Sequence, residues 1–111
     1  MPADAKTIFD EQLPLALAKN PEKAREIGAI YCFKIGGEGG GTWTVDLVSD
    51  TPTVAPGDGG KAQCTIEMQN EDFKAMLGNP TLGMQLYFQG KLKVGGNVAL
   101  AMKVQKLMQL A

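Results

Sequence analysis

Two segments in the middle of the chain alternate apolar and polar residues with a period of two. Within residues 42–48, Trp43, Val45 and Leu47 alternate with threonine and aspartate, and residues 62–68 repeat the pattern. The apolar face of the second segment consists of Ala62, Cys64, Ile66 and Met68. This period is typical of β-strands that bury one face and leave the other in water. The chain is therefore expected to build a sheet with a core on one side.

Helix signals precede these strands. The residues at helical spacing within 4–19 are Ile8, Phe9, Leu13 and Leu17. Pro14 should kink this helix or start a second turn, because proline cannot donate a backbone hydrogen bond. A second helix is expected to begin at Asn20 and Pro21, with Asn20 as its N-cap, and to end at Gly28.

Glycines and prolines divide the rest of the chain. The expected elements are a strand at 29–35, a hairpin turn at 36–41, a helix at 71–77 capped by Asn70, a helix from 79 to about 88, a strand at 91–94, and a final helix capped by Asn97 that reaches about Leu110. Residues 51–61 hold two prolines and three glycines around Val54, and no element is assigned there. The order of elements predicts one α+β domain over residues 1–111 with a mainly antiparallel sheet.

The absence of histidine narrows the chemistry, since it removes Ser-His-Asp and Cys-His catalysis and histidine metal ligation. Cys32 and Cys64 lie in apolar, strand-like segments, which favours buried free thiols over a disulfide. The glycines at 36–41 lie between two strands, which favours a hairpin turn over a nucleotide-binding loop. Asp46 is a lone carboxylate, and although Glu67 could lie across the sheet, a surface acid is the default interpretation. We therefore expect no catalytic residue, metal or cofactor; a thioesterase using Asp46 or a cysteine is the alternative.

Composition and the terminal sequences bear on the expected location of the protein in the cell. Hydrophobic residues make up 44% and charged residues 21%, which is ordinary for a soluble domain. No apolar run approaches the roughly 18–20 residues that span a bilayer, and the N-terminus lacks the pattern of a secretory signal. The last three residues, QLA, do not match a peroxisomal SKL ending. We expect a soluble intracellular protein, cytoplasmic, or peroxisomal if the natural chain continues beyond Ala111.

The charges are unevenly placed along the chain. All 12 acidic residues lie at or before Asp72, whereas residues 73–111 carry five lysines and no acid. The C-terminal third has a formal charge of +5, and the rest has −6, from six basic and twelve acidic residues. This polarity fits attraction to an anionic head group or membrane surface, and the alternative is an ordinary solvated surface. Charges this dispersed do not indicate nucleic-acid binding.

The last predicted helix has a broad apolar face. One side holds Leu100, Ala101, Val104, Leu107 and Met108, and the other holds Lys103, Lys106 and Gln109. Gln105 lies at the border, and Met102 lies within the polar arc. Met76, Met84, Met102 and Met108 all lie in the C-terminal helices, where methionine suits a surface that adapts to variable apolar partners. The pattern alone favours ordinary core packing, with the wall of an apolar cavity over residues 88–110 as the alternative.

The stretch FQGKLKVGGNVALAMKVQ (residues 88–105) resembles the sterol carrier protein 2 family. Further stretches that resemble this family are FKI (33–35), GTWTVDL (41–47), AQCTIEM (62–68) and EDF (71–73). These stretches follow in order over nearly the whole chain, and GKLK followed by GN is quite specific. GNPTLGM (78–84) departs from the family's usual Gly-Lys-x-Asn-Pro-Gln pattern, which bears on the local cavity wall and the choice of ligand.

The resemblance implies a five-stranded sheet covered by helices that enclose a hydrophobic tunnel. It implies binding of fatty acids, fatty acyl-CoA, sterols or phospholipids, with transfer between membranes and no covalent chemistry. It places Trp43, Phe73, Phe88, Met102 and Gln105 at or near the tunnel, with Gln89 as a polar candidate at its mouth. The complete predicted set of ligand-binding residues is Phe33, Trp43, Val45, Phe73, Met76, Leu77, Met84, Phe88, Gln89, Leu100, Met102, Val104, Gln105 and Met108.

The resulting prediction is a non-enzymatic, monomeric carrier of single lipid molecules. Its expected partners are the lipid and, transiently, a membrane surface, with lysines near the tunnel mouth holding an acidic head group. The alternative is an interaction module that presents lipid to a partner enzyme of lipid metabolism.

Overall fold

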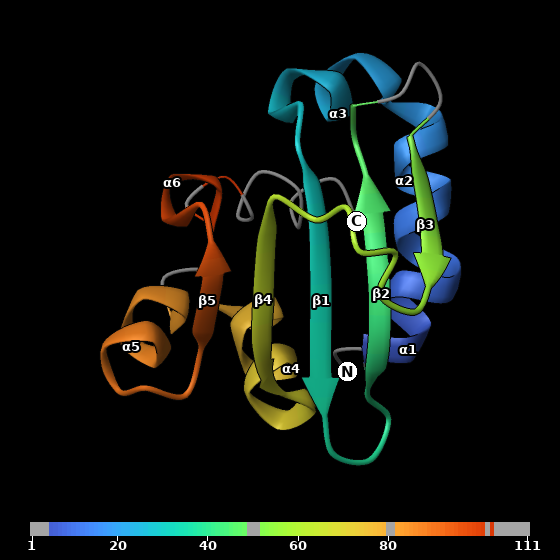
Figure 1. The fold of residues 1–111 in the computed structure, drawn as a ribbon. Coiled ribbons are helices and arrows are strands. Elements are labelled where there is room, and N and C mark those ends of the chain that lie inside the picture. Colours follow the sequence, from blue (N-terminus) through green and yellow to red (C-terminus); the bar gives the residue numbers. More distant parts are fainter. Residues whose placement is uncertain (1–4, 49–51, 80–81, 102, 104–111) are drawn as a thin grey trace.

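A computed structural model describes residues 5–48, 52–79, 82–101 and 103, which form a five-stranded sheet with helices packed on one face (Figure 1). The helical segments are α1 (Ala5–Thr7), the π-helical turn η1 (Ile8–Gln12), α2 (Leu13–Lys19), α3 (Pro21–Ile27), α4 (Asn70–Gly78), α5 (Leu82–Phe88) and α6 (Val98–Ala101). The strands are β1 (Ile30–Gly36), β2 (Gly41–Asp46), β3 (Thr53–Pro56), β4 (Cys64–Gln69) and β5 (Lys93–Gly96). The predicted α+β class is confirmed.

The strands are ordered β3-β2-β1-β4-β5 across the sheet. β1 and β2 form the predicted hairpin, with Phe33 opposite Trp43. β3 extends this meander on one side, and β4 then returns to the other edge of β1 and runs parallel to it, with Phe33 beside Ile66. β5 pairs antiparallel with β4. The sheet is therefore mixed, and three of its four strand pairs are antiparallel, in agreement with a mainly antiparallel sheet.

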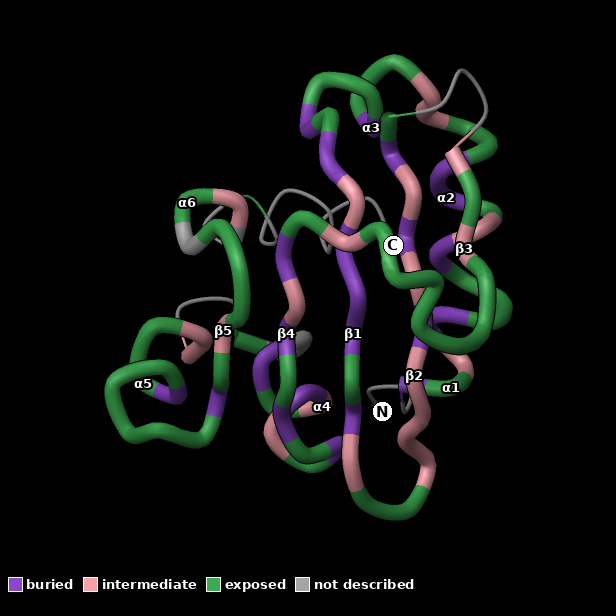
Figure 2. The backbone as a smooth tube through the Cα atoms, in the orientation of Figure 1, coloured by how far each residue is buried: buried purple, intermediate pink, exposed green. Residues whose placement is uncertain are grey.

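The alternation in the sequence separates the two faces of this sheet. The buried face consists of Tyr31, Phe33, Ile35, Trp43, Val45, Cys64, Ile66 and Met68, which pack with the helices in one core. Lys34 and Glu67 lie on the opposite face and are exposed. In Figure 2 the colour along β1 and β4 changes between buried and exposed. Burial of the apolar face is the main driving force for this arrangement.

The N-terminal helix changes its hydrogen bonding just before the proline. The backbone N–H of Leu13 donates to the oxygen of Ile8, five residues back, and this π turn ends where α2 begins. Pro14 then occupies the first turn of α2, where a missing N–H is tolerated. The chain stays helical through Pro14, and the change from π to α hydrogen bonding is the local feature that accompanies the proline. All four residues expected at helical spacing are buried: Ile8, Phe9, Leu13 and Leu17.

The three predicted asparagine caps have different outcomes. Asn20 is the N-cap residue of α3 as expected, but its side chain donates to the oxygen of Ala16 in the preceding helix at 3.1 Å and makes no cap hydrogen bond. Asn70 is the first residue of α4, and its buried side chain bonds to two distant segments instead. Asn97 does cap α6, because its Oδ1 accepts the N–H of Ala99 at 3.0 Å.

From residue 53 onward, several elements differ modestly from the expected ranges. Residues 53–56 form the edge strand β3, although no element was assigned there, and Pro56 is tolerated because a sheet edge does not need its N–H. The strand expected at 91–94 lies at Lys93–Gly96, and the helix expected from 79 lies at Leu82–Phe88. Of the final helix, Val98–Ala101 is described as helix and Lys103 as a turn, and the other residues up to Leu110 lie outside the described residues. Among the described residues, no helix combines the length and apolar character needed to cross a bilayer.

Candidate functional site

An aromatic cluster lies between the buried face of the sheet and the helices. Its centre is Phe9 of η1, whose ring centroid lies 4.8 Å from that of Phe33, 4.9 Å from Trp43 and 5.5 Å from Phe73. Tyr31 extends the cluster along β1, 5.9 Å from Phe33. These rings meet because β1 and β2 place Phe33 opposite Trp43 while η1 and α4 cover them. Stacked and tilted rings at these distances form a large apolar interior.

The structure brings together five of the predicted ligand-binding residues in this interior. All are buried and belong to one core: Phe33, Trp43, Val45, Phe73 and Met76. Leu100 of α6 is partly buried against the same core. Phe9 and Tyr31 are at its centre but were absent from the predicted set, although the helical spacing of Phe9 had indicated burial.

Two hydrogen bonds join the interior to the segments around it. The indole N–H of Trp43 donates to Oδ1 of Asp10 in η1 at 2.8 Å. The hydroxyl of Tyr31 donates to the carbonyl oxygen of Leu100 at 2.7 Å and so connects β1 with α6. Burial raises the pKa of Tyr31 to about 12, with Cys64 as the second cause, so the hydroxyl stays a donor. No sequence signal identified Asp10 as the partner of Trp43, because the contact depends on tertiary packing.

A second group of predicted residues lies on the outer surface instead. Phe88 at the end of α5 is 77% exposed, and Met84 and Gln89 are also exposed. Tyr87 lies beside Phe88, with their rings 5.8 Å apart and edge to face. The structure therefore separates this group from the aromatic cluster. The side chain of Leu77, and residues Met102, Val104, Gln105 and Met108, lie outside the described residues.

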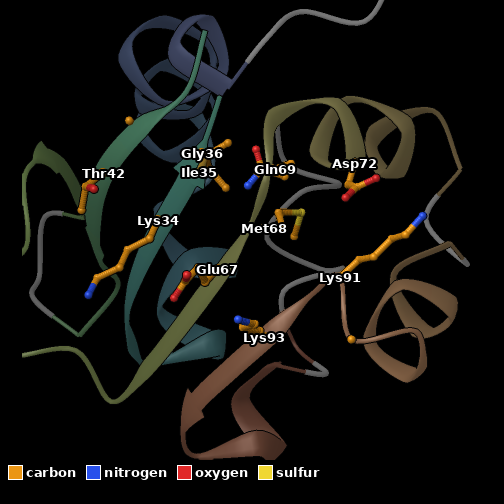
Figure 3. A pocket seen from close by; sticks show the side chains of 12 residues that line it. Lys34, Ile35, Gly36, Thr42, Glu67, Met68, Gln69, Asp72, Lys91 and Lys93 are labelled. Carbon is orange, nitrogen blue, oxygen red and sulfur yellow. The ribbon is translucent and has the colours of Figure 1, made fainter. Parts of the chain in front are cut away.

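A groove of about 750 Å³ lies at the end of the sheet where β1 and β4 finish and β5 begins (Figure 3). Its walls are Lys34, Ile35, Gly36, Gly41, Thr42, Glu67, Met68, Gln69, Asp72, Gly90, Lys91 and Lys93. Lys91 and Lys93 come from the GKLK motif, and Lys34 also forms an ion pair with Asp58 at 3.8 Å. The groove thus has three lysines against two acids, Glu67 and Asp72, and can accept an anionic group at one end of the sheet.

The groups considered for covalent chemistry have identifiable surroundings in the structure. Cys32 and Cys64 are buried and free, as predicted, and burial is the largest cause that raises the pKa of each thiol. A protonated thiol is a poor nucleophile. The register pairs Cys64 with Tyr31 rather than with Cys32, so the two sulfurs point to opposite faces of the sheet. Asp46 accepts the N–H of Val48 at 2.9 Å. Within the described part of the chain, no three histidine, cysteine or acidic side chains gather as a metal site.

Comparison with known proteins places this architecture among lipid carriers. The model of the SCP-2 sterol transfer family matches residues 9–109. Human sterol carrier protein 2 is 37% identical over 106 residues, which cover 93% of this chain and 19% of that protein. Rat hydroxysteroid dehydrogenase-like protein 2 is 40% identical over 88 residues, which cover 78% of this chain and 17% of that protein. The chain thus spans about a fifth of the length of these curated relatives.

Solved structures show the same fold. The sterol carrier protein domain 2 of Helicoverpa armigera superposes with a TM-score of 0.71 at 28% identity, covering 92% of this chain and 85% of that one. The Aedes aegypti sterol carrier protein 2 in complex with palmitate superposes with a TM-score of 0.61 at 20% identity, covering 86% of this chain and 92% of that one. The five-stranded sheet with its helical layer is therefore shared with these proteins.

Proposed function

The chain belongs to the SCP-2 sterol transfer family, and from this premise we propose that it binds single lipid molecules and transfers them without covalent chemistry. The observation that carries the proposal is the family match over residues 9–109, which includes the whole aromatic cluster. Fatty acids and their CoA esters are the first candidates, since a protein of the same fold holds palmitate. Sterols and phospholipids are further candidates of the same apolar class.

The lipid tail is proposed to lie in the apolar interior against Phe33, Trp43, Val45 and Phe73. Met76 is the adaptable part of this wall, because an unbranched thioether repacks at low cost. Met76 also borders α5: a Cβ built on Gly83 would lie only 3.2 Å from its sulfur. Separation at this α4–α5 contact would open the interior. Leu77, Leu100, Met102, Val104, Gln105 and Met108 remain proposed wall residues on the C-terminal side.

The acidic head group of the ligand is proposed to lie near the groove at the end of the sheet. Lys34, Lys91 and Lys93 line this groove, and the ammonium of Lys34 lies toward Asp58, which is not part of the lining. An ammonium group binds a carboxylate or phosphate as a compact point charge and does not impose bidentate geometry. This arrangement favours fatty acids and acyl-CoA over neutral sterols.

Titration with a fluorescent fatty acid tests the main proposal. We expect saturable binding at micromolar protein, because burial of a tail contributes about 0.8 kcal/mol per methylene before ordering costs. Met76→Trp should weaken binding, because the larger side chain would occupy space that the lipid tail needs. Leu15→Trp on the exposed surface of α2 should not weaken it. Absence of saturable binding by the unmodified chain would overturn the proposal, and native mass spectrometry of the purified protein would identify a co-purified lipid.

The second candidate is a module that presents lipid to an enzyme. The relatives extend far beyond the matched region, and one of them is named as a dehydrogenase-like protein. In this case, a partner enzyme should turn over lipid delivered by the chain faster than the same total concentration of free lipid. Equal rates would favour the simple carrier. Hydrolysis of acyl-CoA that disappears in Asp46→Ala would instead indicate an enzyme.

We propose that the chain acts as a monomer inside the cell and touches membranes only transiently. Sedimentation velocity at micromolar concentration should therefore show a single species of monomer mass.

A further inference from the structure

Helix α5 carries apolar side chains on both of its sides, although it stands at the outer edge of the molecule (Figure 1). At about 100° per residue, Tyr87 and Phe88 lie within about 60° of Met84, whereas Leu86 points to the opposite side. Leu86 is buried in the core, while Met84 is 42% and Tyr87 41% exposed. A surface helix normally presents polar residues to water, so an apolar outer face indicates contact with another apolar phase.

The inner side of α5 is firmly attached, which holds the outer side in place. The backbone N–H groups of Lys91 and Leu92 both donate to the oxygen of Leu86, at 2.9 and 3.1 Å. Leu92 is buried beside Leu86 in the same core. Gly90 turns the chain at a φ of +76° between the helix and Lys91. The outer residues therefore project from a fixed element, and Figure 2 shows their exposure along most of α5.

The charges around this face fit an anionic surface. Lys91 lies three residues beyond the end of α5 and is exposed, and Lys93 is exposed two residues later. From Phe73 to Ala111 the sequence contains lysine but neither aspartate nor glutamate. An aromatic pair beside lysines is the composition found at the boundary between lipid head groups and acyl chains.

We infer that the outer face of α5, formed by Met84, Tyr87 and Phe88 and flanked by Lys91, docks on membranes that contain anionic phospholipid. The aromatic pair inserts at the head-group level, and the lysine neutralises phosphate or serine charge. This inference rests on the proposed function, because a lipid carrier must exchange its cargo with a membrane. It also places the docking helix beside the α4–α5 contact at Met76, where the interior is proposed to open.

Flotation with vesicles of phosphatidylcholine and phosphatidylserine tests the docking face. The unmodified chain should float with vesicles that contain 30% phosphatidylserine, should float poorly with phosphatidylcholine alone, and should detach as salt rises. Phe88→Ser and Lys91→Glu should each lower the partition coefficient about fivefold or more. The matched controls lie near the other edge of the sheet: Leu15→Ser removes a residue that is 64% exposed on α2, and Lys23→Glu reverses an exposed charge on α3.

Equal partitioning of Phe88→Ser and Leu15→Ser would overturn the inference. It would also be overturned by a dimer that Phe88→Ser dissociates, which would assign the face to a second copy of the chain. A loss of thermal stability in Phe88→Ser well beyond that in Leu15→Ser would assign the face to packing within the chain, and would overturn it likewise. Fatty-acid titration of Phe88→Ser and Leu15→Ser in solution separates the two proposals, because both variants should keep the binding of the unmodified chain.

Discussion

The hydroxyl of Tyr31 and the carbonyl of Leu100 form a hydrogen bond of 2.7 Å across 69 residues of sequence. Leu100 O also accepts the N–H of Lys103 at 3.0 Å, so both acceptor positions of this carbonyl are used. Through this pair the central strand β1 holds the start of the C-terminal segment against the core. This hydrogen bond and the partial burial of Leu100 both hold the start of α6 against the core.

Removal of the Tyr31 hydroxyl should destabilise the fold modestly. Tyr31→Phe keeps the ring in the aromatic cluster and leaves Leu100 O with the Lys103 N–H, so we expect a loss of about 1 kcal/mol. In a domain of this size the melting temperature should then fall by about 5 °C. Tyr87→Phe is the matched control, because Tyr87 is 41% exposed and loss of its hydroxyl should change the melting temperature little. Equal melting temperatures for the two variants would contradict a structural role for the Tyr31 hydrogen bond.

The raised pKa of Tyr31 predicts a loss of stability in alkali. The unfolded hydroxyl ionises near its ordinary value of 10.0, whereas the folded one keeps its proton to about 12. Since the folded state binds the proton more tightly, the contribution is complete below pH 10 and is lost between pH 10 and 12. Urea unfolding at pH 8 and pH 11 should show a larger decrease for the unmodified chain than for Tyr31→Phe. Parallel decreases would show that other groups, such as the two buried thiols common to both proteins, account for the effect.

Local sequence patterns were sufficient to predict the elements whose formation depends on residues close by in the sequence. The hairpin of β1 and β2 follows from two strand patterns joined by a glycine turn. Gly28, with a φ of +59°, ends α3 where a left-handed residue was expected. In contrast, β3 has a weak pattern of its own and becomes a strand because Val54 pairs with Val45 on the neighbouring strand. The parallel pairing of β1 with β4 was not predicted either, because it depends on the path of the whole chain.

The same distinction holds for the candidate site. Phe33, Trp43 and Val45 converge because strand alternation places them on one face, which a sequence can show. The partner of Trp43 is Asp10, 33 residues away, and no local pattern encodes that contact. Phe88 was expected beside the apolar cavity, and the structure places it on the outer side of α5. Both sides of α5 carry apolar residues, and the packing of this helix against the core decides which side is buried.

The buried side chain of Asn70 should contribute more than an ordinary helix cap. Its Oδ1 accepts the N–H of Ala5 and its Nδ2 donates to the oxygen of Glu38, both at 2.9 Å, so it joins α1, the β1–β2 turn and α4. Asn70→Ala leaves both backbone groups without this partner and should cost about 2 kcal/mol. Asn70→Asp keeps the acceptor, loses the donor and places a carboxylate beside a carbonyl oxygen, so we expect a similar cost. Asn97→Ala, which removes the exposed cap of α6, is the comparison in thermal unfolding and should cost about 1 kcal/mol or less.

The hydrogen bond from Trp43 to Asp10 fixes the η1 turn over the aromatic cluster, and its removal should be visible through the single tryptophan. Asp10→Ala leaves the indole N–H without its 2.8 Å partner, so the free energy of unfolding should fall by about 1–2 kcal/mol. Asp10→Asn keeps an oxygen acceptor at the same position and should lose less than half of that amount. Glu11→Ala, at the exposed neighbouring position, controls for the loss of a negative charge near the helix start. Urea unfolding followed by Trp43 fluorescence ranks the three variants. An Asp10→Ala midpoint equal to that of Glu11→Ala would mean that ring stacking alone holds η1 in place.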